Sequence, residues 1–214
     1  MRSLAKYSCV SWPSTNARGG QIGCVRTGGA DIPVIRNFLC GYIKGAKYAD
    51  KDVLIDYKYL GRDFATWVAS NAQYDIATKQ IKNGADVIFA AAGTHTIEAL
   101  KAAHDNNVFG IGVDANQNHL FPGSILTSVM GNIDNAVFRA LMAAKANIWG
   151  EQIKAIGLQE KGVELAFDKY NKNLISKELR TQLDKITSDI ILKNIHLSDY
   201  ASLNACIYEG EVLF

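Results

Sequence analysis

The sequence predicts an α/β fold, in which a Rossmann-like parallel sheet is covered by flanking helices. Short apolar runs alternate with amphipathic stretches between residues 21 and 150, and parallel strands need crossovers of this length, which are usually helices. A chain of 214 residues, 48% of them hydrophobic, can also fill the core of one large domain. The alternation of apolar and amphipathic stretches and the length of the chain together favour a parallel sheet with helices on both faces.

The alternation assigns the elements one by one. Residues 31–49 have apolar positions at helical spacing, and Pro33 falls in the first turn, where proline is tolerated. Gly84 ends the next helix, and Thr94 is placed to cap the one after it. The expected strands are 21–25, 52–60, 86–92, 108–114 and 125–130, and the expected helices are 31–49, 65–84, 94–107 and 132–150.

Changes in pattern divide the chain into three parts. Residues 1–20 have no period, and we expect an irregular lead-in there. Residues 21–150 form the predicted Rossmann-like ligand-binding lobe. In residues 151–214 we expect one or two strands over 152–167, with a Glu-Lys-Gly turn, and then a charged helix over 176–194 that opens with a serine cap.

Composition and charge narrow the classes of partner. Lys and Arg number 23 against 21 Asp and Glu, a net charge of +2 without a basic tract, so nucleic acid is not an expected partner. No apolar stretch reaches the ~18–20 residues that span a bilayer. The basic N-terminus lacks the apolar segment of a secretory signal, so we identify no signal peptide in this chain.

The four cysteines, Cys9, Cys24, Cys40 and Cys206, are widely spaced. Neither a C-x-x-C pair nor histidines at zinc-ligand spacing accompany them, so we expect no metal site. Because Cys24 and Cys40 fall within apolar patterns, we expect these cysteines to act as small buried hydrophobic side chains.

One motif suggests nucleotide chemistry. Residues 110–115 read G-I-G-V-D-A and fit the G-x-G-x-x-A form of the dinucleotide fingerprint. That chemistry needs glycines after a strand and at the start of a helix, where backbone amides face a pyrophosphate. Here Gly110 and Gly112 lie inside an apolar run, and no helical period follows before the next Pro-Gly. We interpret 108–114 as a strand that delivers Asp114 to a cleft; a small nucleotide-cofactor-dependent enzyme is the alternative.

Ligands of open α/β sheets bind outside the carboxyl ends of the strands. There Asp114 can accept hydrogen bonds from a diol, with a capping or turn-forming aspartate as the alternative. Phe89 offers a ring face to a planar ligand, with core packing as the alternative. Gly93 would let backbone amides approach a ligand. Asp31 follows the first strand, and the set of small residues, carboxylates and amides suits a polar small molecule.

Catalytic signatures are weak. The sequence contains no G-x-S-x-G, P-loop or H-E-x-x-H motif. Of the histidines only His95 falls on a cleft loop, and none has metal-site spacing. The sequence therefore favours a ligand-binding module, without cofactor, over an enzyme.

Four stretches resemble the basic membrane protein (BMP) family of substrate-binding lipoproteins, which includes purine nucleoside receptors of bacterial ABC transporters. They are GGADIPVIRNFLCGYIKGAKY, NGADVIFAAAGTHTIEALKAA, VFGIGVDANQNHLFPGSILTSV and AIGLQEKGVELAFDKYN, in the family's order. The resemblance implies a type I periplasmic-binding-protein fold, whose two lobes close on a nucleoside. Residues 21–150 would be mainly the second lobe. Residues 151–214 would be hinge-crossing strands and a helix of an incomplete first lobe.

The resemblance also implies roles for single residues. The aspartate of the IGVD stretch holds the ribose in such receptors, which corresponds to Asp114, and the glycine after the AAA run corresponds to Gly93. An aromatic residue stacks on the base, and Phe89 is the candidate for it. A purine nucleoside ligand, an ABC transporter permease as partner, and a periplasmic or membrane-anchored location are further implications.

Three features depart from the family pattern. Family members carry most of a first lobe before the GG-x-D-I-P stretch, whereas this sequence starts shortly before that stretch. Cys9 has no signal sequence in front of it, so lipid attachment is not transferred to it. The family's T-S-x-x-K ends here in Gly131, which replaces a cationic ligand contact. The effector domain of a regulator shares the fold by analogy only, and residues 1–20 supply no DNA-binding helix pair.

Overall fold

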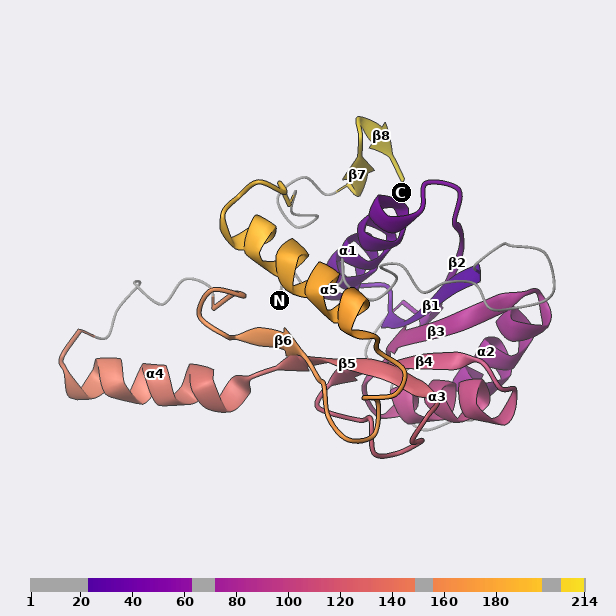
Figure 1. Ribbon diagram of the computed structural model, residues 1–214, viewed down its shortest axis with the longest axis horizontal. Helices are drawn as coiled ribbons and strands as arrows, with labels where there is room; N and C mark the ends of the chain where they lie inside the picture. The colour runs from indigo at the N-terminus through magenta and orange to yellow at the C-terminus, as the bar shows by residue number, and fades with distance from the viewer. Residues whose placement is uncertain (1–22, 63–71, 149–155, 198–204, 214) are drawn as a thin grey trace.

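A six-stranded sheet forms the centre of the computed structural model (Figure 1). Its strands are β1 (Gly23–Ala30), β2 (Leu54–Gly61), β3 (Ala85–Ala91), β4 (Phe109–Asp114), β5 (Ile125–Gly131) and β6 (Val163–Leu165). The order is β2-β1-β3-β4-β5-β6. The first five strands in this order run parallel, and β6 is antiparallel to β5. The predicted α/β fold with a parallel sheet is confirmed.

The structure describes residues 23–62, 72–148, 156–197 and 205–213, of which 23–28 and 211 are described by their backbone alone. The predicted lead-in over residues 1–20 and Cys9 lie outside these ranges, as does the side chain of Cys24. None of the described helices is long and apolar enough to cross a membrane.

The helices follow the predicted order. They are α1 (Pro33–Ala49), α2 (Ala72–Lys82), α3 (Thr96–Asp105), α4 (Ile133–Lys145) and α5 (Lys177–Ile191), with a short 3-10 turn, η3, over Gly93–His95. Pro33 opens α1 as expected, and the Ser176 hydroxyl accepts a hydrogen bond from the Leu179 amide at 3.1 Å, which confirms the predicted cap of α5. The expected cap at Thr94 is wrong, because η3 intervenes and α3 begins at Thr96.

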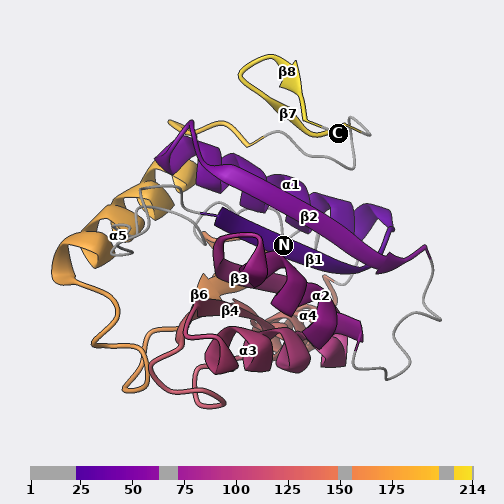
Figure 2. The ribbon, with the colours of Figure 1, turned by 90° about the vertical axis from the view of Figure 1, so that its right-hand side faces the viewer.

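Helices cover both faces of the sheet, as the alternation predicts (Figure 2). Successive strand residues point to opposite faces. In β3, Val87, Phe89 and Ala91 belong to one apolar cluster, together with residues of α1 and α5, whereas Ile88 and Ala90 belong to a second cluster with residues of α2 and α3. The central strand is therefore buried on both sides, which explains its unbroken apolar sequence.

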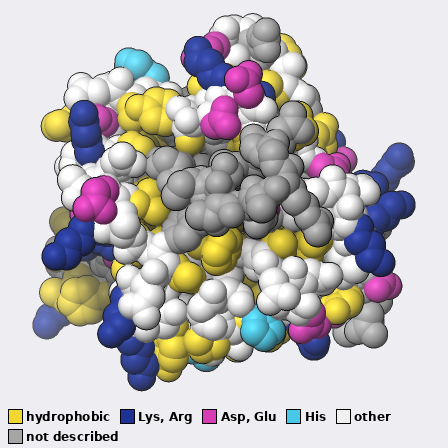
Figure 3. Space-filling model, turned by 45° about the vertical axis from the view of Figure 1, so that its right-hand side comes forward, with side chains coloured by type: hydrophobic (Ala, Val, Ile, Leu, Met, Phe, Trp, Pro, Cys, Tyr) yellow, Lys and Arg dark blue, Asp and Glu magenta, His cyan; other side chains and the backbone are white. Residues whose placement is uncertain are grey.

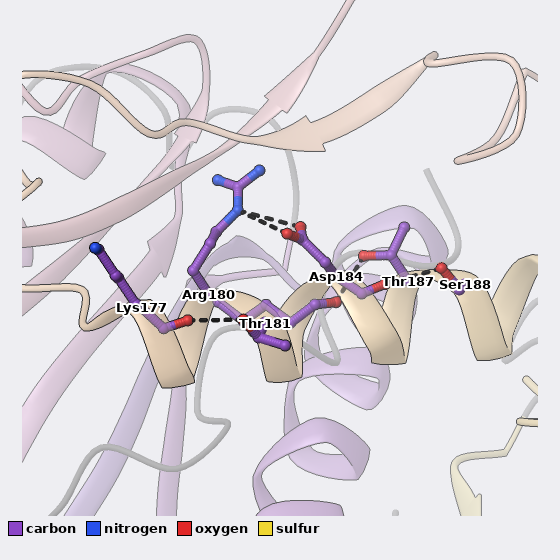
Figure 4. Close-up of polar contacts among 7 residues, drawn as sticks. Lys177, Arg180, Thr181, Asp184, Thr187 and Ser188 are labelled. Carbon is purple, nitrogen blue, oxygen red and sulfur yellow. Dashed lines mark hydrogen bonds and ion pairs between the residues drawn. The ribbon is translucent and has the colours of Figure 1, made fainter.

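The C-terminal helix α5 packs against the same face of the sheet as α1. Leu179, Leu183 and Ile186 of α5 are buried in the same cluster as the residues of β3 and α1. Their spacing puts them on one face of the helix. Figure 4 shows polar contacts along the helix, where Arg180 Nε donates to both carboxylate oxygens of Asp184 at 3.1 and 3.2 Å. The apolar face of α5 is thus covered by this lobe.

Helix α4, the last element of the predicted lobe over residues 21–150, does not pack on the sheet in the described part of the structure. None of its residues is buried, and the helix extends away from the sheet (Figure 1). Of the strands expected over 152–167, the described residues form only β6; residues 156–162 are a turn, closed by the Gly162 amide donating to the Gly157 carbonyl at 2.8 Å.

A disulfide corrects the expectation for two of the cysteines. Cys40 of α1 and Cys206 are both buried, as predicted for Cys40, but they are bonded to each other, with Cα atoms 5.4 Å apart. The bond ties α1 to a small hairpin of β7 (Ile207–Tyr208) and β8 (Glu211–Val212). A local apolar pattern indicates burial, but it contains no information on a partner 166 residues away.

Candidate functional site

The parallel strands end at one common edge of the sheet, where ligands bind in folds of this kind. Asp31 follows β1, Gly93 follows β3 by one residue, and Asp114 ends β4. β1, β3 and β4 are adjacent in the sheet. The structure therefore brings three of the four predicted site residues to neighbouring positions along this edge.

Asp114 is the carboxylate at this edge that is free to accept a ligand. Its backbone has φ 69°, a left-handed conformation that aspartate tolerates better than most residues. The side chain is exposed, and no hydrogen bond from the described residues reaches its carboxylate. Desolvation by the surrounding protein nevertheless raises its pKa above the ordinary value for aspartate. No helix begins here, so Asp114 caps none.

Buried polar side chains hold the loop that follows Asp114. Gln117 Oε1 accepts a hydrogen bond from the Val113 amide at 3.0 Å, and the Gln117 amide donates to Ser128 Oγ at 3.0 Å. The Ser128 hydroxyl in turn donates to Asn118 Oδ1 at 2.8 Å, and Asn118 and Ser128 are fully buried. Buried groups that are fully hydrogen-bonded fix one geometry. This network anchors the chain on the carboxyl-terminal side of Asp114.

The same loop is tied to residues beyond β6. Asp168 Oδ2 accepts hydrogen bonds from Asn116 Nδ2 at 2.8 Å and from Asn118 Nδ2 at 3.1 Å. Asn171 Nδ2 donates to the carbonyls of Leu126 and Ala166 at 2.8 and 2.9 Å. Sequence reasoning missed Asp168 and Asn171, because they come from a distant segment that has neither helical nor strand periodicity.

The glycines of G-I-G-V-D-A are needed for packing. A Cβ at Gly110 would lie 2.6 Å from Leu100 Cδ2 of α3, and one at Gly112 would overlap Ser128 Oγ. Both glycines are inside β4, and the residues from 115 to 124 form turns without a helix. The alternative of a phosphate-binding loop required a helix at Asp114, which the structure does not have.

Gly93 has φ +59°, and a Cβ built on it would meet nothing within 4 Å. Glycine is therefore favoured by its backbone conformation, and no described residue fills the space above it. His95, the histidine expected on a cleft loop, is instead buried, with Nδ1 3.2 Å from Glu98 Oε1. The ring is packed at the start of α3 and does not line the open edge.

Asp31 is already paired within the protein. Arg36 donates from Nε to Asp31 Oδ1 and from Nη2 to Oδ2 at 2.9 Å. The hydrogen bond from Arg36 lowers the pKa of Asp31, against an opposing effect of desolvation. A ligand at Asp31 would have to share a carboxylate that the guanidinium holds in a two-pronged contact.

Phe89 lies in the core. Its side chain has 0% exposure, and its ring stacks on Tyr42 of α1 with centroids 4.9 Å apart. In this conformation the ring has no surface that a ligand could reach. The position supports the core-packing alternative for Phe89.

The described residues provide no group of three or more His, Cys, Asp or Glu side chains that could hold a metal ion. On the face shown in Figure 3, basic and acidic side chains are interspersed. The edge thus offers one free carboxylate, an open glycine turn and a rigidly held polar loop, which are features of a site for a small polar ligand.

The fold is that of the type I periplasmic-binding-protein class. A solved ABC transporter solute-binding protein from Conexibacter woesei superposes with a TM-score of 0.72 at 17% identity, over 92% of this chain and 61% of that one. A second, from Aeropyrum pernix, gives a TM-score of 0.68 at 22% identity, over 86% and 59%.

The chain belongs to the Bmp family, described as "ABC transporter substrate-binding protein PnrA-like", whose profile matches residues 14–200. Basic membrane protein A1 of Borrelia garinii is 33% identical over 183 residues, which are 84% of this chain and 52% of that protein. The chain thus spans about half the length of this curated relative. The family predicted from the four sequence stretches is confirmed.

Proposed function

We propose that this chain contributes the ligand-binding edge of an ABC transporter receptor for a purine nucleoside or a similar polar ligand, and that Asp114 accepts the hydrogen bonds of a ribose diol. The observation that carries the proposal is the unpaired carboxylate of Asp114 at the end of β4. The neighbouring turn at Gly93 gives a ligand room to approach the backbone.

The electrostatics of Asp114 suit this role. Its raised pKa means that the protein around it solvates the ionised carboxylate less well than water does. Two hydroxyl donors from a diol would restore that solvation, and charge-assisted hydrogen bonds contribute roughly 1.5–3 kcal/mol each. The network through Gln117 and Ser128 holds the loop in place before a ligand arrives, so little ordering is required on binding.

The family supports a partner and a location for the complete receptor. We propose an ABC transporter permease as the partner of the complete receptor, and a periplasmic or membrane-anchored location. An uncharacterized lipoprotein of Pyrococcus furiosus, 32% identical over 151 residues, supports the location. The Cys40–Cys206 disulfide supports it too, because such bonds persist in oxidising compartments.

We propose binding without catalysis. The cofactor-dependent enzyme was the alternative motivated by G-I-G-V-D-A, and its glycines serve packing against Leu100 and Ser128. Family members are described as substrate-binding proteins, and the free carboxylate of Asp114 has no base or nucleophile hydrogen-bonded to it among the described residues.

Calorimetric titration of the purified chain tests the proposal. Guanosine, inosine and adenosine are titrated alongside their 2′,3′-dideoxy analogues, which lack only the diol. We expect heat with at least one nucleoside and a loss of about tenfold or more in affinity for its dideoxy analogue. Equal affinities within a pair would contradict the role of Asp114, and no heat with any nucleoside would show that this chain alone is not a competent receptor for the proposed ligand.

A further inference from the structure

The backbone turn at Asp114 is strained. The Ala115 amide donates to the Val113 carbonyl at 2.9 Å, which closes a three-residue turn around Asp114, whose φ is 69°. A turn of this kind with positive φ at its central residue is rare, and strained residues persist only where the surrounding structure holds them. The pairing of Asp114 with Met130 in the sheet fixes the chain up to the turn. The chain after the turn needs an anchor of its own.

Asp168, in the segment after β6, provides that anchor. Its Oδ2 accepts hydrogen bonds from Asn116 Nδ2 at 2.8 Å and from Asn118 Nδ2 at 3.1 Å, and its Oδ1 accepts from the Tyr170 amide at 2.7 Å. Desolvation favours the neutral form of Asp168, but these hydrogen bonds outweigh it and lower the pKa of the carboxyl. The ionised carboxylate is therefore the form that holds the two asparagine side chains of the loop.

Asp168 is itself fixed to β5. The Ala166 amide donates to the Ser128 carbonyl at 2.9 Å. The side chain of Asn171, which is fully buried, accepts from the Asp168 amide at 2.9 Å and donates to the Leu126 carbonyl at 2.8 Å. Buried hydrogen bonds of this kind leave the backbone of the segment one position relative to the sheet. The carboxylate of Asp168 therefore holds the loop from a rigid support.

We infer that Asp168 is a positioning residue for the ligand-binding edge. By holding the asparagine side chains of the loop, it keeps the strained turn that presents the Asp114 carboxylate to a ligand. The inference rests on the proposed function for the ligand, whereas the held turn is a property of the chain alone. A carboxylate is needed at the position, because an asparagine has one acceptor oxygen in place of two and would turn its NH2 group toward other donors.

Amide hydrogen exchange of the complete chain, followed by NMR, tests the anchor without a ligand. The amides of Val113, Gln117 and Asn118 each donate to a side-chain oxygen of the network that holds the loop. Asp168→Asn should speed the exchange of these three amides about tenfold or more, because the loop opens more often once hydrogen bonds to an ionised acceptor are lost. Asn116→Ala removes the same contact at an exposed position and should also speed it, so the test does not depend on the folding of one variant.

An exchanged pair shows whether the contact itself is responsible. In the double variant Asn116→Asp/Asp168→Asn, the amide at position 168 can donate to the carboxylate at position 116, and its oxygen can still accept from the Tyr170 amide. We expect most of the slow exchange to return. Asp189→Asn is the matched control, because Asp189 of α5 also accepts from an asparagine side chain, that of Asn194, at 3.1 Å. It should leave the exchange of the loop amides unchanged.

Two further readouts connect the anchor to the site. Asp168→Asn should lower the pKa of Asp114, measured by NMR, toward the ordinary aspartate value, because the relaxed turn gives its carboxylate more water. It should also weaken nucleoside binding about tenfold in calorimetry.

Unchanged exchange in Asp168→Asn, no recovery in the exchanged pair, or an unaltered pKa of Asp114 would overturn the inference. An unaltered affinity would overturn it too if the wild type binds a nucleoside. A wild type that binds none bears on the proposed function alone, because the exchange rates and the pKa of Asp114 still decide the inference.

Discussion

Asp114, the last residue of β4, is paired in register with Met130 of β5, one residue before β5 ends. The carboxylate therefore stands beside the point where the chain leaves the sheet toward α4. A ligand held by Asp114 would therefore lie outside the edge of the sheet from which α4 extends.

Asp114→Asn should weaken nucleoside binding about ten- to a hundredfold, because the charged acceptor is lost while the side-chain shape and the left-handed backbone preference are kept. The thermal midpoint should stay or rise, since the ionised carboxylate is poorly solvated in the fold. Calorimetry and thermal unfolding measure both. Asp52→Asn, at the opposite end of the sheet before β2, is the control. Unchanged affinity with a lowered midpoint would show a structural role instead.

Binding should weaken as the pH falls through the raised pKa of Asp114, that is, at a higher pH than for an ordinary aspartate. The contribution of Asp114 to the stability of the fold changes with pH in the opposite direction to binding. A carboxyl whose folded pKa is raised stabilises the fold below its unfolded pKa, and that contribution is lost as the pH rises through the folded pKa. Urea unfolding of the wild type minus that of Asp114→Asn, between about pH 3 and pH 7, should follow this trend. A difference independent of pH would refute it.

Gly110→Ala should destabilise the protein by about 1–3 kcal/mol, because the added methyl group collides with Leu100 on α3. Gly131→Ala is the matched control: a Cβ there meets nothing within 4 Å, and we expect a change within about 0.5 kcal/mol. Leu100→Ala should offset part of the Gly110→Ala effect in the double variant. Denaturant unfolding provides the measurement. An unaltered midpoint for Gly110→Ala would revive the interpretation of these glycines as a binding loop.

Reduction of the Cys40–Cys206 disulfide should lower the free energy of unfolding by about 2–5 kcal/mol, because the bond closes a long loop in the unfolded chain. Cys206→Ser should have the same effect, and dithiothreitol should then no longer remove this contribution to the free energy of unfolding. Peptide mapping without reductant should recover residues 40 and 206 in one linked fragment. Separate fragments from protein folded under oxidising conditions would contradict the pairing.

The order of the elements was predictable from the sequence, since helical and strand periods are local. The strands and helices from β1 to α4 appear in the predicted order, and the Ser176 cap of α5 depends only on neighbouring residues. The position of Asp114 was predictable for the same reason: a carboxylate that ends an apolar strand of a parallel sheet must reach the carboxyl edge.

Only the tertiary structure decided which surfaces those elements pack against. The amphipathic pattern shows that α4 and α5 each have an apolar face, but not that the sheet covers α5 and leaves α4 exposed. The burial of Phe89 against Tyr42 and the bond between Cys40 and Cys206 likewise join residues far apart in the chain. Such contacts depend on which surfaces meet when the layers pack, and periodicity along the sequence carries no information about that choice.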